Sequence, residues 1–423
     1  MDNNQRYLSK IDNKRYAQMI NPEYSNKLKH ILTQEETNLL IAPVTRNEIK
    51  EALFEIDEES APGPDGYTST FFKAAWPVIG QAISDAIGEF FRTGKLLKQV
   101  NATLLALILK VNLPTQVSDY RPIACCNVIY KTITKIIVKR MQLVLHMLIG
   151  HSQNAFVPRC SISDNILLAQ ELLAGYNQAK LPPICTLKVD IQKAYDLMEW
   201  DFLLEVLKLF NFPPQFIGWI AQCVTTTSFS ISLNGSIYGF FKGGRGLRQG
   251  EPTSPYLFVL VMEIWSSLLR YRVQRIDQFQ YHWKCKELGI LNLCFADDVI
   301  LFCKAHIPSI EVLKGSLSEF ANLSGLNVNP TKSQIILSRA VQQERQQIID
   351  FLGFQEGSLP VKYLGVPLTS SRLTLADCRP LNGHSFGRLE SYAGRLQLIK
   401  SVLSTLHTYW ASVFIYRKAS SKS

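Results

Sequence analysis

ILNLCFADDVILFC, residues 290–303, is the stretch of sequence that decides the fold. Two apolar runs, LNLCF and VILFC, meet at Ala296, Asp297 and Asp298, which predicts a β-hairpin with the two aspartates at its tip. A second short apolar run, ICTLKVD (residues 184–190), also ends in a carboxylate, Asp190. If these strands are neighbours in one sheet, three carboxylates converge on a small volume.

Three carboxylates at one sheet edge indicate a cation site. Like charges at that distance repel and raise one another's pKa unless a cation lies among them. Oxygen ligands suit Mg²⁺, which keeps some waters and accepts substrate phosphates as its remaining ligands. Two such ions, for which Mn²⁺ can substitute, activate a hydroxyl and neutralise the charge on a leaving pyrophosphate. An Asp-Asp pair at a hairpin tip is also ordinary turn chemistry, so the surrounding motifs decide.

Composition bounds the class of protein. With 423 residues, of which 47% are apolar, the chain can bury a large core, and its strands and helices mix without regular alternation. We therefore expect an α+β fold. No stretch reaches the ~18 uncharged apolar residues of a membrane span, and residues 256–265, interrupted by Glu263, are predicted to form a buried helix. The nine cysteines show no zinc spacing and are predicted to be reduced thiols. The polar start favours an intracellular protein.

The net charge of +10 is unevenly distributed. Nine Lys or Arg residues from Lys362 onward face only Asp377 and Glu390. A basic segment suits a polyanionic partner, although a solubilising surface explains it equally well. Lys131, Lys135 and Lys139 form a row that either tracks a phosphate backbone or is a solvated helix face.

Two helices are clear from the sequence. Thr45-Arg46-Asn47-Glu48 matches a capping box, and the helix that it begins must end before the APGPDG segment at 61–66. Residues 128–148 form a second helix with an apolar stripe at helical spacing.

Four motifs in order resemble the reverse transcriptase of plant-type non-LTR retrotransposons (LINE elements). FADD at 295–298 resembles the aromatic-Ala-Asp-Asp box, and KVDIQKAYD at 188–196 resembles the preceding palm motif. GLRQGEP at 246–252 resembles the Gly-Leu-Arg-Gln-Gly-Asp-Pro segment, and DYRPI at 119–123 resembles the fingers motif. The resemblance extends over roughly residues 45–415. It implies a right-hand polymerase fold with fingers, palm and a truncated helical thumb.

The resemblance also implies roles for individual residues. Asp190, Asp297 and Asp298 would hold the metal ions, and Tyr195 would be the steric gate that excludes a 2′-hydroxyl. Asp196 is not expected to be a ligand. The expected nucleotide-binding residues are Tyr195, Arg121, Lys110, Gln249 and Gly250. Gly246 and Gly250 would let the backbone approach the template–nucleotide pair.

The remaining roles concern the leaving group, the primer and the template. Lys332, after SGLNVN at 324–329, would lie near the leaving pyrophosphate. KYLGVPL at 362–368 resembles the primer-grip hairpin, so Tyr363, Leu364, Gly365 and also Arg248 are expected to bind primer or template. The segment from Gln153 to Asn165 is expected to grip the template in the fingers. For Arg121, Lys332 and Tyr363, local pairing, a surface position or core packing are the open alternatives.

The resemblance divides the chain into four parts. Residues 1–44 are a polar extension, 45–99 the first part of the fingers, 100–368 the reverse transcriptase domain, and 369–423 a partial basic thumb. The chain departs from the pattern at Leu109, Arg159-Cys160, Glu251 and Thr253, and the stretch 382–390 is short. An upstream endonuclease and a downstream zinc knuckle or RNase H domain are not seen, which suggests a fragment of a mobile element.

The sequence therefore predicts an RNA-directed DNA polymerase that extends a primer 3′-hydroxyl with deoxynucleoside triphosphates. Its partners would be an RNA template and a DNA primer, without a membrane, and nuclear action is implied by the resemblance alone. An RNA-dependent RNA polymerase is disfavoured by Ala296 and Tyr195. The alternative from another class is a catalytically weak or inactive nucleic-acid-binding remnant.

Overall fold

The computed structural model describes residues 22–370. The helices are η1 (Pro22–Lys27), α2 (Gln34–Leu40), α3 (Arg46–Phe54), α4 (Ser69–Thr93), η2 (Val117–Asp119), α5 (Val128–Leu148), α6 (Ile162–Leu173), α7 (Trp200–Leu209), α8 (Pro214–Thr225), α9 (Ser254–Arg275), α10 (Ile307–Ser324) and α11 (Arg345–Leu352). The strands are β1 (Ala102–Leu109), β2 (Tyr120–Cys126), β3 (Ile184–Asp190), β4 (Ser228–Leu233), β5 (Ser236–Lys242), β6 (Asn292–Phe295), β7 (Asp298–Lys304), β8 (Gln334–Leu337), β9 (Gln355–Glu356), β10 (Val361–Tyr363) and β11 (Val366–Leu368). The α+β prediction is confirmed.

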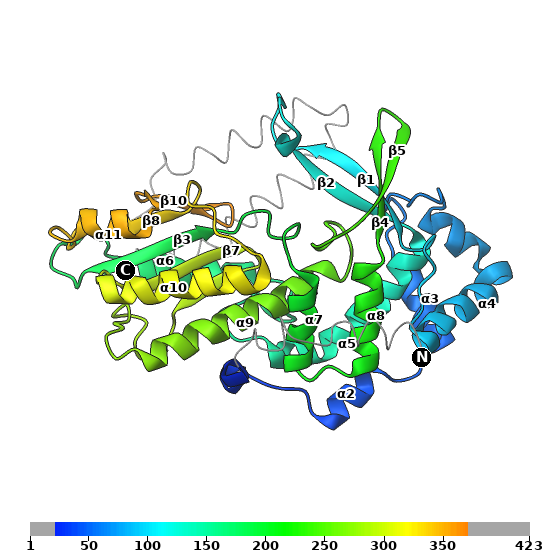
Figure 1. Cartoon of the computed structure of the whole chain (residues 1–423), viewed down its shortest axis with the longest axis horizontal. Coiled ribbons are helices and arrows are strands. Elements are labelled where there is room, and N and C mark those ends of the chain that lie inside the picture. The colour runs from blue at the N-terminus through cyan, green and yellow to red at the C-terminus, as the bar shows by residue number, and fades with distance from the viewer. Residues whose placement is uncertain (1–21, 371–423) are drawn as a thin grey trace, which may run out of the picture.

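The palm sheet has five strands in the order β6-β7-β3-β8-β9. Its alternating side chains are buried on both faces, because α9 and α10 cover one face while α6 and the β10–β11 hairpin cover the other. On the first face lie Leu187 and Leu301, and on the second Ile300 and Phe302. Figure 1 shows this layering, with α10 below the sheet and β10 above it. Burial on both faces explains the nearly continuous apolar runs of β3 and β7.

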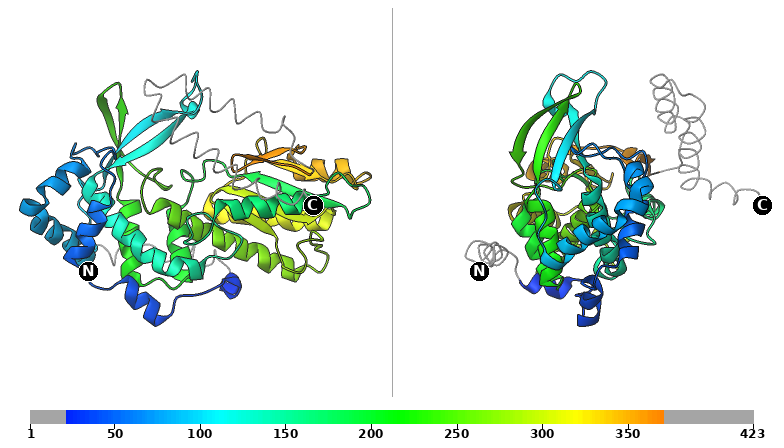
Figure 2. Two further views of the ribbon diagram at one scale, coloured as in Figure 1. Left: turned by 180° about the vertical axis from the view of Figure 1, so that it is seen from behind. Right: turned by 90° about the vertical axis from the view of Figure 1, so that its right-hand side faces the viewer.

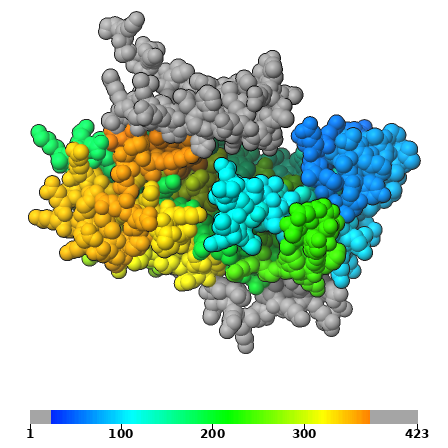
Figure 3. All heavy atoms as spheres, turned by 90° about the horizontal axis from the view of Figure 1, so that it is seen from above, coloured from blue at the N-terminus to red at the C-terminus, as the bar shows by residue number. Residues whose placement is uncertain are grey.

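The fingers sheet has four strands in the order β2-β1-β4-β5, with β1 parallel to β4. It stands at one end of the helical body, as the right-hand view of Figure 2 shows. Every residue of β5 is exposed, and β1 is only partly buried. In Figure 3 the β1–β2 hairpin, in cyan, lies between the palm segments in yellow and orange and the N-terminal helices in blue.

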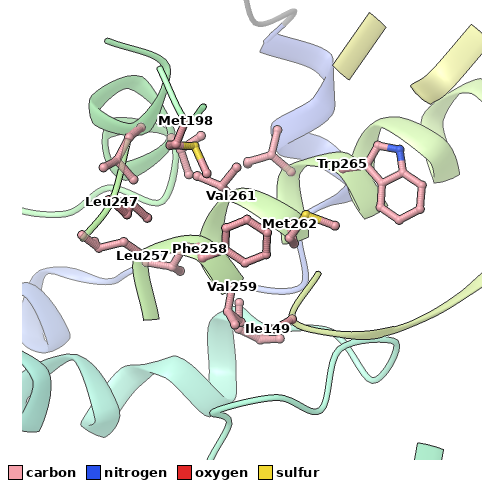
Figure 4. Packing of buried hydrophobic residues seen from close by; sticks show 14 of the residues in the cluster. Ile149, Met198, Leu247, Leu257, Phe258, Val259, Val261, Met262 and Trp265 are labelled. Carbon is pink, nitrogen blue, oxygen red and sulfur yellow. The ribbon is translucent and has the colours of Figure 1, made fainter. Parts of the chain in front are cut away.

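Helix α9 is the central element of the core, and the prediction of a buried helix over 256–265 is confirmed. Phe258, Met262 and Trp265 are almost fully buried. Figure 4 shows Met198 and Leu247 gathered near the first turns of α9, with Trp265 further along the helix. The fully buried carboxylate of Glu263 is 2.6 Å from the Arg270 guanidinium and accepts from the Gly150 N–H at 3.0 Å. No helix within residues 22–370 is long and apolar enough to cross a membrane.

Helices α3 and α5 correct two predictions. The Thr45 hydroxyl caps α3, but the Glu48 carboxylate forms a two-pronged pair with Arg140 of α5. The row of lysines on α5 is neither a phosphate track nor a solvated face. Lys131 donates to Ser60 Oγ and the Ala61 carbonyl, while Lys135 and Lys139 pair with Glu55. Glu55 at the end of α3 thus holds Lys135 and Lys139, and neutral oxygens of the following loop hold Lys131.

The segment 22–44 joins the core rather than extending from it. Tyr24, Leu32 and Leu40 are buried in the main apolar cluster, and η1 packs on α9. The expected thumb, 369–423, and residues 1–21 lie almost wholly outside the described residues. Within 22–370 the eight cysteines are free thiols, as predicted, and all but Cys125 and Cys160 are buried.

Candidate active site

Asp190 and Asp298 lie side by side at one end of the palm sheet. Strands β3 and β7 are antiparallel neighbours, and their register pairs Asp190 with Asp298. Directly paired residues point to the same face, here the face that the β10–β11 hairpin covers further along. The expectation that the two strands are neighbours is confirmed.

Asp297 occupies the turn that joins β6 to β7. Phe295 and Asp298 are paired, so Ala296 and Asp297 form a two-residue turn, and Ala296 has φ of 54°. A left-handed backbone is disfavoured for alanine, because its Cβ approaches the carbonyl oxygen. The turn therefore needs support from outside the hairpin, and it orients Asp297 differently from a strand residue.

The pKa values of Asp297 and Asp298 are both raised. The pKa of Asp297 is raised by burial and by the charge of Asp190. The pKa of Asp298 is raised by burial and by the charges of Asp297 and Asp190, against the lowering effect of Lys188. The site thus concentrates negative charge that the protein does not neutralise. A cation among these oxygens relieves the repulsion.

A cleft of about 770 Å³ lies between the palm and the fingers sheet. It brings together eight residues that the sequence singled out for the metal ions, the nucleotide or the leaving group: Lys110, Arg121, Asp190, Tyr195, Gln249, Gly250, Asp297 and Lys332. Arg121 is exposed on β2, and Lys110 is held by its bond to the Ser118 carbonyl at 2.8 Å. Arg121 and Lys110 thus lie on the fingers side of the cleft, and the carboxylates lie with Lys332 on the palm side.

Tyr195 lies on the loop after β3 and lines this cleft. Its ring stacks on Phe258 of α9, with 5.2 Å between centroids and 20° between planes. Burial, followed by the charge of Asp297, raises the pKa of Tyr195 to about 12. The ring is a rigid, neutral surface beside the carboxylates. Asp196 accepts instead from Gln249 Nε2 at 3.3 Å.

A turn at 329–333 closes around the end of β3. The Asn329 N–H donates to the Asp190 carbonyl at 2.8 Å, and the Asp190 N–H donates to Ser333 Oγ at 3.0 Å. Ser333 is fully buried, whereas Lys332 is exposed at the cleft. The turn fixes Asp190 and carries Lys332 into the same space.

The side chain of Arg248 corrects a prediction, because it points into the protein. Its guanidinium donates to Asn101 Oδ1 and Thr103 Oγ1, each at 2.9 Å, to the Cys223 carbonyl and to the Tyr130 hydroxyl. It also lies 4.1 Å from the centroid of the Tyr130 ring. This buried group joins the fingers sheet to α5 and α8 and does not reach a template.

The glycines of the GLRQGEP segment serve the protein's own packing. A Cβ on Gly246, whose φ is 89°, would meet the Asp196 carbonyl at 2.6 Å. A Cβ on Gly250 would meet Ile123 of β2 at 3.3 Å. The expected close approach is therefore to neighbouring protein. Glu251 is buried and accepts from Tyr130, Thr253 and Ser254 hydroxyls.

The hairpin at 361–368 has the expected shape, but Tyr363 is core. Tyr363 is 1% exposed and packs in the second apolar cluster. Leu364 and Gly365 form the two-residue turn, with φ of 48° and 85°. Lys188 Nζ donates to the Lys362 carbonyl at 2.7 Å, which ties the hairpin to β3. A contact with primer is open to the turn, not to the Tyr363 ring.

Gln153 and Asn165, at the two ends of the segment expected to grip the template, are buried in the palm, while a template contact by the residues between them stays a prediction. Both residues are 1% exposed. Gln153 Oε1 accepts from the Ala296 N–H in the turn after β6, and Asn165 Nδ2 donates to the Cys294 carbonyl of β6. Ser333 was missed altogether. A buried hydroxyl or amide has no sequence signature of its own, although Gln153 and Asn165 stood in a motif that resembles the family.

The donor set fits a divalent cation only in part. Within residues 22–370, no three His, Cys, Asp or Glu side chains are arranged closely enough to hold a metal ion by themselves. The adjacent carboxylates at the sheet edge nonetheless supply hard oxygen donors, and Mg²⁺ takes few of its ligands from protein.

The comparisons assign the family. The profile of the "Reverse transcriptase (RNA-dependent DNA polymerase)" family matches residues 108–368. The fold and site define a palm-type polymerase domain, and the chain belongs to the reverse transcriptase family. The family generally uses divalent metal ions and a nucleic acid template.

Relatives come from mobile elements. The "Transposon TX1 uncharacterized 149 kDa protein" of Xenopus laevis is 27% identical over 89% of this chain and 29% of its own length. The Pol polyprotein of the type-2 retrotransposable element R2DM of Drosophila melanogaster is 23% identical over 74% of this chain and 29% of its own. The chain thus spans about three tenths of these relatives. A solved telomerase from Candida tropicalis is 14% identical with a TM-score of 0.43, over 73% of this chain and 60% of that one.

Proposed function

We propose that this chain is the polymerase part of a non-LTR retrotransposon protein and copies RNA into DNA from a primer 3′-hydroxyl. The observation that supports this most is the pairing of Asp190 with Asp298, with Asp297 in the adjoining turn, at the edge of a cleft lined by cations. The family and the mobile-element relatives support the same reaction.

Asp190, Asp297 and Asp298 would hold Mg²⁺, or Mn²⁺ in its place. When bound, the two ions lower the barrier to attack by the primer hydroxyl and stabilise charge on the departing pyrophosphate. The chain's own part is to hold the carboxylates on buried strands, so that they need not reorganise during the reaction.

Cations that line the cleft would orient the deoxynucleoside triphosphate. Arg121 offers a planar fork that suits phosphate oxygens, and Lys332 offers an ammonium near the leaving group. The Tyr195 ring, fixed on Phe258, would leave no room for a 2′-hydroxyl. RNA template and DNA primer are the proposed partners, and nuclear action stays a prediction.

Primer extension on an RNA template tests the proposal. We expect Mg²⁺-dependent product with deoxynucleotides and much less with ribonucleotides. Asp297→Asn removes the negative charge of one carboxylate while nearly keeping the shape of the side chain. It should lower the rate at least ~10³-fold, since a catalytic metal contributes several kcal/mol and each 1.4 kcal/mol is tenfold.

Asp350→Asn is the matched control, because Asp350 is an exposed carboxylate on α11 and should leave the rate unchanged. Equal background product from the unaltered chain and Asp297→Asn would contradict the polymerase function. Retained affinity for an RNA–DNA hybrid without extension would instead identify an inactive binding remnant, and a ribonucleotide preference would identify an RNA polymerase.

A further inference from the structure

A side chain from a distant segment holds the turn that carries Asp297. Gln153 Oε1 accepts from the Ala296 N–H and from the Ala155 N–H, each at 3.0 Å. Gln153 Nε2 lies 3.5 Å from the Ala296 carbonyl. One buried amide thus engages the backbone N–H and carbonyl of the residue whose φ is 54°.

The segment that carries Gln153 is itself fixed to strand β6. The Cys294 N–H donates to the Ser152 carbonyl at 2.6 Å, and the Asn154 N–H donates to the Cys294 carbonyl at 3.3 Å. Asn165 Nδ2 donates to the same carbonyl at 2.7 Å. The outer edge of β6 is therefore bonded to this segment where another strand would otherwise lie. Gln153 is held at a fixed position relative to the turn.

The position of Asp297 depends on this contact. Alanine disfavours the left-handed region, and the hairpin's own ladder ends at Phe295 and Asp298, so it does not bond the Ala296 N–H. Without an acceptor this inward-facing N–H would be left unpaired, and a different turn would become favourable. A different turn redirects the Asp297 side chain away from Asp190.

We propose that Gln153 is a positioning residue, which fixes Ala296 in the left-handed conformation and so directs the Asp297 carboxylate into the cleft beside Asp190. This inference rests on the proposed polymerase function. The segment that carries Gln153 also contacts the β10–β11 hairpin, because Asn165 Nδ2 lies 3.5 Å from the Tyr363 hydroxyl. One amide network thus spans β6 and the hairpin expected to meet the primer.

Two variants of similar shape distinguish the role of the Gln153 hydrogen-bond acceptor from the role of its packing. Gln153→Met fills the same space without an acceptor, whereas Gln153→Glu keeps an oxygen that can accept both N–H bonds. Asn292→Leu is the matched control, because Asn292 is a buried amide on β6 whose Nδ2 donates to Ser266 Oγ and Cys294 Sγ and to neither Ala296 nor Asp297.

The first readout is amide hydrogen exchange of a peptide covering 292–299, which needs no activity. Gln153→Met should speed exchange at the turn by about tenfold or more, with β3 and α10 unchanged. The second readout is primer extension. The rate constant kcat should fall about 30- to 100-fold with KM for the deoxynucleotide within about threefold, since a misplaced catalytic group affects chemistry more than binding. Gln153→Glu should recover only part of both losses, because it restores the two acceptor bonds but not the donor that faces the Ala296 carbonyl.

Unchanged exchange at the turn in Gln153→Met overturns the inference, whether or not the chain polymerises. Equal losses of kcat in Asn292→Leu and Gln153→Met overturn it as well, because general loosening of the hairpin would then explain the effect. If the unaltered chain extends no primer, the proposed function fails, and the exchange data alone still decide whether Gln153 fixes the turn.

Discussion

The palm sheet and the fingers sheet meet at one cleft, yet they hold their cleft residues in opposite ways. The palm places carboxylates at the ends of strands that are buried on both faces. The fingers place Arg121 on β2 and Lys110 directly after β1, in a sheet whose outer strand, β5, is entirely exposed. Few buried contacts mean lower local stability, so we expect the exposed edge of the fingers sheet to be less stable than the palm sheet. The difference indicates that the palm holds its carboxylates on buried strands, whereas the fingers present their cations from a more exposed sheet.

The largest expected effect concerns how the fingers are attached. Arg248→Met should destabilise the fold by about 3–5 kcal/mol, since it leaves Asn101, Thr103 and the Cys223 carbonyl without their buried cationic partner. Denaturant unfolding measures the loss. Arg245→Met is the control, because this exposed arginine, 3.3 Å from Glu199, should contribute at most about 1 kcal/mol. Similar losses in both variants would remove the distinction between anchor and surface charge.

A smaller effect is expected for Arg121 on the fingers side of the cleft. Arg121→Ala should raise KM for the deoxynucleotide about 30-fold with unchanged folding stability, because a hydrogen bond to a charged group contributes about 2 kcal/mol. Arg92→Ala removes an exposed arginine from α4, outside the cleft, and should leave KM unchanged. Steady-state kinetics decides, and a loss of stability without a change in KM would make Arg121 structural.

The smallest expected effect is a gain of folding stability when Asp298 of the palm sheet loses its charge. Asp298→Asn should stabilise the metal-free fold at neutral pH, because burial and the charges of Asp297 and Asp190 raise the pKa of Asp298. A raised pKa means that the folded state favours the protonated form. The stability advantage of asparagine should therefore shrink as pH falls through that pKa. Thermal unfolding against pH measures it. A loss of stability at neutral pH would show that repulsion among the three carboxylates does not destabilise the metal-free fold.

Much of the fold followed from local patterns. The apolar runs around FADD predicted the hairpin, and the stripe on 128–148 predicted α5, since both elements bury residues at the spacing of their backbone. The directions in which long side chains point could not be predicted from these local patterns. Arg248 and Lys131 were read as surface cations, and only the neighbouring α5, α8 and APGPDG segment turn them inward. A family motif also does not reveal what each of its residues contacts: Gln153 was expected to contact the template, but it bonds to the Ala296 backbone.

The sequence by itself determined which chemistry is present: three carboxylates at strand ends, a tyrosine five residues after the first, and cations in the expected order. Only the tertiary structure decided which of these groups meet. Register brought Asp190 opposite Asp298, and packing sent Arg248 and Tyr363 into the core. The physical reason is that a strand's alternation is local, whereas hydrogen-bond partners for a buried polar group come from segments far along the chain.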